Sequence, residues 1–263
     1  MINAKKSLGQ NFLTDKNIIN KILNLVDIKN KNVIEIGPGK GALTNEILKR
    51  DPKRLLLIEK DDKISQELNQ IYSNVKNVKI YNKDILKFNL EKIVNKDSAI
   101  FGNLPYNISS QILVGILKFK KWPPNFNDLV LMFQKELGEK ILGRFETKNY
   151  GRLSILSNYK LNILKKFLVS NNCFSPKPKI TSMVIHFQPK KGFLYKIKDL
   201  NNLEKITNIL FSNKRKMINK NFIKLKINHN KFIKNINIDL KLRPEQINEK
   251  IYYKIAEYFE KTK

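Results

Sequence analysis

Short apolar runs rich in β-favouring residues recur through the first half of this 263-residue chain. They fall at residues 32–36, 54–59, 78–81, 98–101 and 128–133. Between them, segments such as 42–49, 61–72 and 109–118 space their apolar side chains as one face of a helix does. Strands and helices that alternate in this way predict a mostly parallel sheet with helices on both faces.

Two later runs and a basic tail complete the predicted architecture. Residues 161–169 and 182–187 are typical of strands, and we expect them to close one edge of the sheet in antiparallel fashion. Residues 1–189 hold 32 basic and 16 acidic side chains, whereas residues 190–263 hold 19 and 7, so the tail is more basic per residue. We therefore predict an α/β, Rossmann-like domain over residues 1–189 and a small all-helical domain over residues 190–263.

The composition favours a nucleic-acid partner in the cytoplasm. A net charge of +28 and a pI near 10 attract polyanions, although lysine-rich surfaces also arise in AT-rich genomes. The single cysteine, Cys173, excludes an internal disulfide framework. The sequence shows no signal peptide and no apolar run of the roughly 18 residues that span a membrane, so we expect a cytoplasmic protein without membrane contact.

The stretch "VIEIGPGKGALT" (33–44) combines a strand, a glycine-rich turn and the start of a helix. An ordinary strand-to-helix turn does not need glycines at positions 37, 39 and 41, whereas a turn that approaches a ligand closely does. The E-x-G-x-G-x-G spacing is associated with S-adenosylmethionine sites and differs from the dinucleotide pattern G-x-G-x-x-G. Glu59 ends the next strand and could accept both ribose hydroxyls, as it could for a nicotinamide cofactor. Asp84 follows the third strand and could hold an adenine amino group.

A second motif, "GNLPYN" (102–107), follows the fourth strand. The exocyclic amine of adenine is a poor nucleophile because its lone pair is delocalised into the ring. Acceptors that grip its N–H groups would help, and the Asn103 side-chain oxygen and a backbone carbonyl near Leu104 can supply them. Pro105 would fix the turn, and Tyr106 would offer a ring on which the base stacks. A plain Asn-Pro turn is the simpler alternative.

Seven motifs, taken in order, resemble those of the bacterial small-subunit ribosomal RNA adenine dimethyltransferases. They are "KKSLGQNFLTD" (5–15), "VIEIGPGKGALT" (33–44), "IEKD" (58–61), "GNLPYNISSQIL" (102–113), "LMFQKE" (131–136), "YGRLSIL" (150–156) and "FSPKPKITSMVIHF" (174–187). The resemblance covers nearly all of residues 1–189 and continues more weakly beyond them.

This resemblance implies an enzyme that places two methyl groups on N6 of each of two adjacent adenosines near the 3′ end of small-subunit RNA. It implies S-adenosylmethionine as cofactor, an immature ribosomal particle as partner, a monomer, and no metal. The residues that it places around the cofactor are Asn11, Leu13, Gly37, Glu59, Asp84 and Asn103. It also implies that Phe174 sandwiches the target base opposite Tyr106; without the motif, Phe174 would be interpreted as a core residue.

Three alternatives stay open from the sequence. A sister family methylates large-subunit RNA, but it usually has serine where Gly9 stands and carries a different C-terminal domain. An RNA-binding assembly or transcription factor on an inactive methyltransferase fold would be expected to have degraded motifs, and here they are intact. A nicotinamide oxidoreductase is disfavoured by the glycine spacing and by "NLPY".

In the tail, "FSNKRKMINKNFIKL" (211–225) has apolar residues at helical spacing. Lys216, Lys220 and Lys224 are four apart, which predicts that they share another face of the same helix and bind RNA phosphates. The alternative is a solvated lysine face. The two histidines, His186 and His229, are interpreted as structural because neither has sequence neighbours typical of a metal site or a triad.

Overall fold

The computed structural model describes residues 10–225, 236 and 238–262, and its contacts divide the chain into two compact units. The first unit holds the residues up to 138 together with 162–189; the second holds 139–161 and 190–263. The first unit thus differs from the predicted range 1–189 in one segment, 139–161. This segment belongs with the C-terminal helices because Tyr150 donates a hydrogen bond to the Ile247 carbonyl (2.9 Å) and Tyr253 donates one to the Ile155 carbonyl (2.9 Å).

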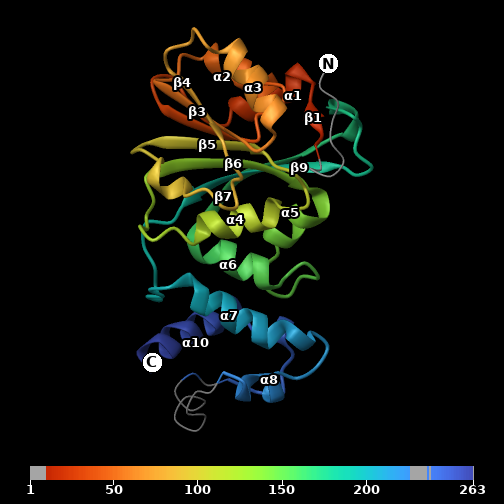
Figure 1. The fold of residues 1–263 in the computed structure, drawn as a ribbon. Coiled ribbons are helices and arrows are strands. Elements are labelled where there is room, and N and C mark those ends of the chain that lie inside the picture. Colours follow the sequence, from red (N-terminus) through yellow and green to blue (C-terminus); the bar gives the residue numbers. More distant parts are fainter. Residues whose placement is uncertain (1–9, 226–235, 237, 263) are drawn as a thin grey trace. The chain divides into compact units, whose positions relative to one another are not determined.

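The first unit contains a seven-stranded sheet in the order β4-β3-β2-β5-β6-β9-β7 (Figure 1). The strands are β2 (Asn32–Ile36), β3 (Arg54–Glu59), β4 (Val78–Asn82), β5 (Ser98–Asn103), β6 (Phe126–Gln134), β7 (Leu161–Val169) and β9 (Ser182–Pro189). Strands β2 to β6 run parallel, and β9 pairs antiparallel with β6. The predicted parallel sheet with an antiparallel strand beyond it is confirmed.

The strand order reverses between β2 and β5. From β2 the chain passes outward to β3 and β4, then returns to place β5 on the other side of β2 and continues to β6. The connections that follow β2 and β5 therefore diverge, which opens a crevice at the carboxyl ends of these strands. This is where the glycine-rich turn and the "NLPY" turn both emerge.

Helices cover both faces of this sheet. In Figure 1, α1, α2 and α3 lie on one face and α4 lies on the other. Their bounds are α1 (Lys16–Leu23), α2 (Ala42–Leu48), α3 (Asp62–Ile71) and α4 (Ser109–Leu117); α5 (Lys135–Ile141) follows β6. Aspartates begin two of them: the Asp15 carboxylate accepts from Ile18 N, and the Asp61 carboxylate accepts from Lys63 N and Ile64 N.

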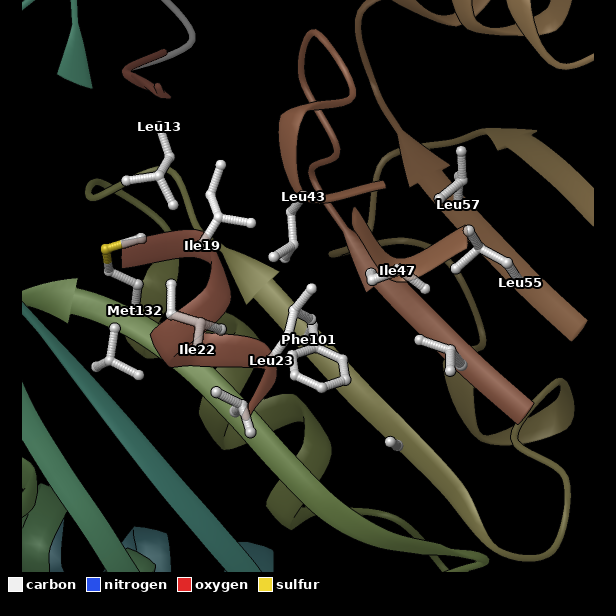
Figure 2. Close-up of a cluster of buried hydrophobic side chains, with 14 of the residues drawn as sticks. Leu13, Ile19, Ile22, Leu23, Leu43, Ile47, Leu55, Leu57, Phe101 and Met132 are labelled. Carbon is white, nitrogen blue, oxygen red and sulfur yellow. The ribbon is translucent and has the colours of Figure 1, made fainter. Parts of the chain in front are cut away.

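The main hydrophobic core lies between helices α1 and α2 and the sheet (Figure 2). Ile22 and Leu23 of α1 and Ile47 of α2 meet Leu55 of β3 and Phe101 of β5, and all five side chains are buried. Burying a side chain of this size contributes roughly 1.5–3 kcal/mol. The apolar periodicity seen in the sequence thus fixes the helices that flank the crevice.

A two-stranded antiparallel sheet ties the N-terminal segment to a distant part of the same unit. Strand β1 (Phe12–Leu13) pairs with β8 (Phe174–Ser175), which follows the short 3₁₀ turn η3 (Asn171–Cys173). Thr14 adds two bonds to the Cys173 carbonyl, from its N–H (2.9 Å) and from its hydroxyl (3.1 Å). This pairing holds residues 11–13 at the crevice.

The second unit is helical, as predicted for the tail. It contains α6 (Arg152–Lys160), α7 (Leu200–Leu210), η4 (Phe211–Asn213), α8 (Asn219–Ile223), η5 (Pro244–Gln246) and α10 (Glu249–Lys261). The prediction of one helix over 211–225 is wrong. The chain turns after η4, where Lys216 N bonds to the Asn213 carbonyl, and Ile218 N then bonds outside the segment, to the Leu242 carbonyl. Among the described residues, no helix has the length and apolarity needed to span a membrane.

Candidate active site

A pocket opens at the carboxyl ends of β2, β3, β4 and β5, and eight of the residues predicted from the sequence line it. They are Asn11, Leu13, Gly37, Glu59, Asp84, Asn103, Leu104 and Tyr106. The residues come from five separate segments of the chain, which the sheet and the β1–β8 pairing bring together.

The glycine-rich turn requires glycine for two physical reasons. Gly37, Gly39 and Gly41 all have positive φ angles, of 69°, 54° and 79°. A Cβ on Gly39 would also lie 2.7 Å from the Phe12 ring, so even a methyl group would force that ring to shift. The turn therefore brings bare backbone to the pocket, where a ligand can lie directly against it.

Glu59 ends β3 and faces this turn. Its carboxylate accepts hydrogen bonds from Gly39 N (3.3 Å) and Asp61 N (2.9 Å), one on each oxygen. Burial raises the pKa of Glu59 above its ordinary value, while these backbone N–H groups act to lower it. Each carboxylate oxygen keeps a lone-pair site for another donor, so the pair can accept the two hydroxyls of a ribose.

Glu35 lies beneath the turn, and the sequence interpretation gave it no role. Its side chain is buried, at 2 % exposure, and its carboxyl accepts a hydrogen bond of 2.7 Å from the Thr44 hydroxyl. Burial raises the pKa of Glu35 to about 8, against the smaller lowering by the Thr44 bond. Glu35 is the first residue of the E-x-G-x-G-x-G pattern, so the sequence did point to it. The spacing of that pattern cannot show, however, that the Glu35 carboxyl is held in its neutral form.

Asp84 follows β4 at the open side of the pocket. It pairs with the Lys60 ammonium (2.9 Å) and accepts from Leu86 N (3.0 Å). The Lys60 bond, followed by the Leu86 bond, lowers the pKa of Asp84. The carboxylate is therefore charged and partly exposed at the pocket, a placement from which it can accept from an amino group.

Asn103 ends β5 and is oriented by the N-terminal segment. Its side-chain nitrogen donates to the Asn11 backbone carbonyl (3.0 Å), and its Oδ1 accepts no hydrogen bond from the described residues. The Asn103 carbonyl also lies close to the glycine turn, 3.5 Å from the position of a Cβ on Gly37. Because the amide nitrogen is engaged, Oδ1 is the atom that Asn103 presents as an acceptor.

Tyr106 is anchored through its hydroxyl. Its Oη and the Ser182 Oγ of β9 lie 2.6 Å apart, and Ser182 is completely buried. Burial raises the pKa of Tyr106, against the effect of the Ser182 bond, so the phenol is neutral. The sequence interpretation gave no role to Ser182. It lies within the 174–187 motif, but nothing in that motif indicates a contact with Tyr106, which is 76 positions away.

The structure does not bring Phe174 into this pocket. Its side chain is 4 % exposed, belongs to the hydrophobic core with Phe12 and Leu13, and is absent from the pocket lining. In β8 it pairs with Leu13. This position matches the core interpretation, and the stacking role opposite Tyr106 stays a prediction.

The three tail lysines meet in a shallow groove of the second unit even though they do not share one helix. We call this the C-terminal groove; it is lined by Asn213, Arg215, Lys216, Met217, Asn219, Lys220, Asn221, Lys224 and Arg243. Lys216 precedes α8, Lys220 lies in its first turn and Lys224 follows its end. The five cations of the groove form no ion pair within the described residues, whereas neighbouring Lys214 pairs with Glu245 (3.2 Å).

His186 has a partner that the sequence interpretation did not foresee. Its Nε2 lies 2.7 Å from Asp128 Oδ1 between β9 and β6, and Gln188 also donates to that oxygen (3.2 Å). Although burial acts to raise the pKa of Asp128, these bonds lower it overall. His229 lies outside the described residues, as does Gly9. Within the described chain, no group of three His, Cys, Asp or Glu side chains is placed to hold a metal ion.

A family model described as ribosomal RNA adenine dimethylase matches residues 1–261. The chain belongs to this family. Ribosomal RNA adenine dimethylases are methyltransferases, which excludes the nicotinamide oxidoreductase considered from the sequence. The suspected resemblance is confirmed.

One curated relative and one solved structure support the assignment, and a second solved structure shares the fold. "Ribosomal RNA small subunit methyltransferase A" of Pelagibacter ubique is 46% identical, over 98% of each chain. The crystal structure of a dimethyladenosine transferase from Plasmodium falciparum has a TM-score of 0.76 and 26% identity, covering 95% of this chain and 98% of that one. The 23S rRNA methyltransferase ErmE shares the fold, with a TM-score of 0.66 and 21% identity over 95% of this chain and all of that one.

The methyl donor of the ribosomal RNA adenine dimethylase family is S-adenosylmethionine, and the pocket fits it. The glycine turn leaves no Cβ between the backbone and a ligand, and Glu59 and Asp84 offer carboxylates at consecutive strand ends. Leu13, Ile58 and Ile85 supply apolar surface on the same pocket. Two carboxylate acceptors at consecutive strand ends suit the hydroxyl and amino groups of a nucleoside.

Proposed function

We propose that this chain places two methyl groups on N6 of each of two adjacent adenosines near the 3′ end of small-subunit ribosomal RNA, and that it acts on an immature small-subunit particle. The observation that carries the proposal is Asn103. Its Oδ1 is presented as an acceptor in the same pocket as the glycine turn and Glu59.

The cofactor would be held from three sides. Glu59 would accept the ribose hydroxyls on the lone pairs that Gly39 N and Asp61 N leave available. Asp84 would accept from the adenine amino group, and Gly37, with Asn11 and Leu13 of the N-terminal segment, would enclose the methionine part. S-adenosylmethionine supplies an electrophilic methyl group on its sulfonium.

The target amine would be activated by acceptors and not by a base. Asn103 Oδ1 and a backbone carbonyl near Leu104 would accept hydrogen bonds from the two N6–H groups of adenine and draw the nitrogen towards tetrahedral geometry. The lone pair could then form the bond to the methyl carbon while the carbon–sulfur bond of the sulfonium breaks and its electron pair stays on sulfur. The N6 proton would leave to water after the carbon–nitrogen bond has formed. Because Asn103 also bonds to the Asn11 carbonyl, its orientation is fixed before the substrate arrives.

Tyr106 would hold the target base, flipped out of its RNA context, against its ring. Base–aromatic stacking contributes roughly 1–3 kcal/mol per base. The Ser182 bond restricts motion of the phenol and would so hold the ring in one orientation at the pocket. A partner role for Phe174 would require its side chain to leave the core.

RNA docking would use the C-terminal groove, with Lys216, Lys220 and Lys224 binding phosphates. Five cations of the groove have no carboxylate partner among the described residues, which supports this role. A merely solvated lysine face would be expected to include acidic side chains as well. We further propose that the enzyme acts as a monomer in the cytoplasm, where ribosomal particles are assembled.

The decisive experiment is incubation with labelled S-adenosylmethionine and, in separate reactions, undermethylated small-subunit particles or large-subunit RNA, followed by mapping of the modified nucleosides. We expect N6,N6-dimethyladenosine at two adjacent positions near the 3′ end of the RNA. Label on large-subunit RNA alone would indicate the sister activity, and no label on either RNA would refute the proposed function.

A further inference from the structure

A second basic groove lies at the opposite end of the sheet from the methyl-donor pocket. We call it the amino-edge groove, because its residues precede or begin strands β2, β3, β4 and β5. It is lined by Asn32, Lys53, Arg54, Lys76, Asn77, Val78, Lys79, Asn95, Lys96 and Asp97, all in the first unit. The groove is shallow and encloses about 870 Å³.

The charge of this groove is almost entirely positive. Lys53, Arg54, Lys76, Lys79 and Lys96 line it, and none forms an ion pair with a carboxylate among the described residues. The one acid, Asp97, already accepts a hydrogen bond from Asn127 Nδ2 (3.0 Å). Five of the six charged residues of the groove are basic, against 51 of 74 in the chain as a whole.

The cations are carried on backbone that side-chain bonds hold in place. Asn32 Nδ2 donates to the Lys96 carbonyl (3.4 Å), and Asn77 Nδ2 donates to the Pro52 carbonyl (2.8 Å). Lys53 N bonds to the Lys31 carbonyl (2.9 Å). These bonds link the loops before neighbouring strands, so the amino-edge groove presents its charges from a fixed base.

We propose that the amino-edge groove is a second RNA-binding surface, which takes the phosphate backbone of a ribosomal RNA segment other than the one that carries the target adenosines. Four neighbouring strand ends span about 14 Å, which is enough for several phosphates in series. Strands of five and six residues put the groove about 16–20 Å from the pocket, so one flipped nucleotide and its immediate neighbours do not reach it. The inference rests on the proposed function, and it makes a large folded RNA the natural substrate.

The test compares two variants with the same net charge. The groove variant combines Lys53→Gln, Lys76→Gln and Lys96→Gln. The control variant combines Lys92→Gln, Lys120→Gln and Lys165→Gln, which are exposed lysines of the same unit outside this groove and the pocket. Binding to undermethylated small-subunit particles is measured between 50 and 200 mM salt, with single-turnover methylation in parallel and S-adenosylmethionine binding by calorimetry.

If three phosphate contacts are lost, the slope of log K against log salt should flatten by about 2–3 for the groove variant and by much less for the control. The factor by which the groove variant binds the particle more weakly than the wild type should then be about 20–40 times larger at 50 mM than at 200 mM salt. S-adenosylmethionine affinity should be unchanged in both variants.

Equal slopes for the two variants would overturn the proposal, and so would a loss of S-adenosylmethionine binding in the groove variant, which would mean that the unit itself is disturbed. A wild type that binds the particle but does not methylate it would count against the proposed function. The difference in salt slope between the groove variant and the control variant would still show whether the amino-edge groove binds RNA.

Discussion

Replacing Glu35 by glutamine should make the first unit more stable at alkaline pH. Folding raises the pKa of this carboxyl from 4.5 to about 8 because the side chain is buried beneath the glycine turn. Between these two values the folded state keeps the proton that the unfolded state releases. Stability therefore falls as pH rises through this window, and Glu35→Gln removes the dependence because the amide does not titrate.

The magnitude follows from the two pKa values. With 1.36 kcal/mol per pKa unit, the contribution of Glu35 to the free energy of unfolding should drop by about 2–3 kcal/mol between pH 6 and pH 9. Glutamine keeps an oxygen that can accept from the Thr44 hydroxyl, so the packing and the hydrogen bond are both retained. Between pH 6 and pH 9, the free energy of unfolding of Glu35→Gln should therefore rise relative to that of the wild type by about the same 2–3 kcal/mol.

Urea unfolding followed by tryptophan fluorescence is suited to this measurement. The chain has a single tryptophan, Trp122, which lies in the same unit as Glu35. Glu46→Gln is the matched control, because Glu46 is a carboxylate of α2 whose pKa is lowered, chiefly by the bond from Lys49, and which stays charged across the window. If the Glu35→Gln and wild-type curves fall in parallel from pH 6 to pH 9, Glu35 is ionised in the folded state and the reasoning fails.

Three further substitutions test the proposed chemistry and docking. Asn103→Ala should reduce single-turnover methyl transfer by about 10²–10³ while S-adenosylmethionine binding, measured by calorimetry, stays largely intact; a rate within a few-fold of wild type would remove Asn103 from the mechanism. Tyr106→Phe and Ser182→Ala should each slow methylation, and the double variant should be no slower than either alone, because both break the same 2.6 Å contact; additive effects would argue for separate roles. Glutamine at Lys216, Lys220 and Lys224 should flatten the salt slope of particle binding by about 2–3 without changing cofactor affinity, and an unchanged slope would make these lysines surface decoration.

Periodicity predicted the sheet well because buried strands and amphipathic helices leave strong local patterns. It failed over residues 211–225, where Ile218 N bonds to the distant Leu242 carbonyl instead of continuing a helix. The contacts that join the segment 139–161 to the C-terminal helices could not be predicted for a related reason, since the bonds of Tyr150 and Tyr253 leave no pattern in the local sequence.

Some residues of the candidate site could be predicted from the sequence, and others could not. Motifs located Gly37, Glu59 and Asn103, because their residue types carry the chemistry themselves. Ser182 and the neutral state of Glu35 could not be predicted, since both depend on burial and on partners brought together by the fold. The stacking role of Phe174 came from the family motif alone, and the structure places its ring in the core.

The pairing of β1 with β8 sets a time at which the pocket can be completed during protein synthesis. Residues 11–13 form one wall of the pocket, yet the bonds that hold them involve Cys173, Phe174 and Ser175; the Thr14–Cys173 bond alone joins residues 159 positions apart. At a synthesis rate of 5–20 residues per second, the ribosome needs about 8–32 s to add that length of chain. Until then the nascent enzyme has its glycine turn and its asparagine but lacks the wall that orients them.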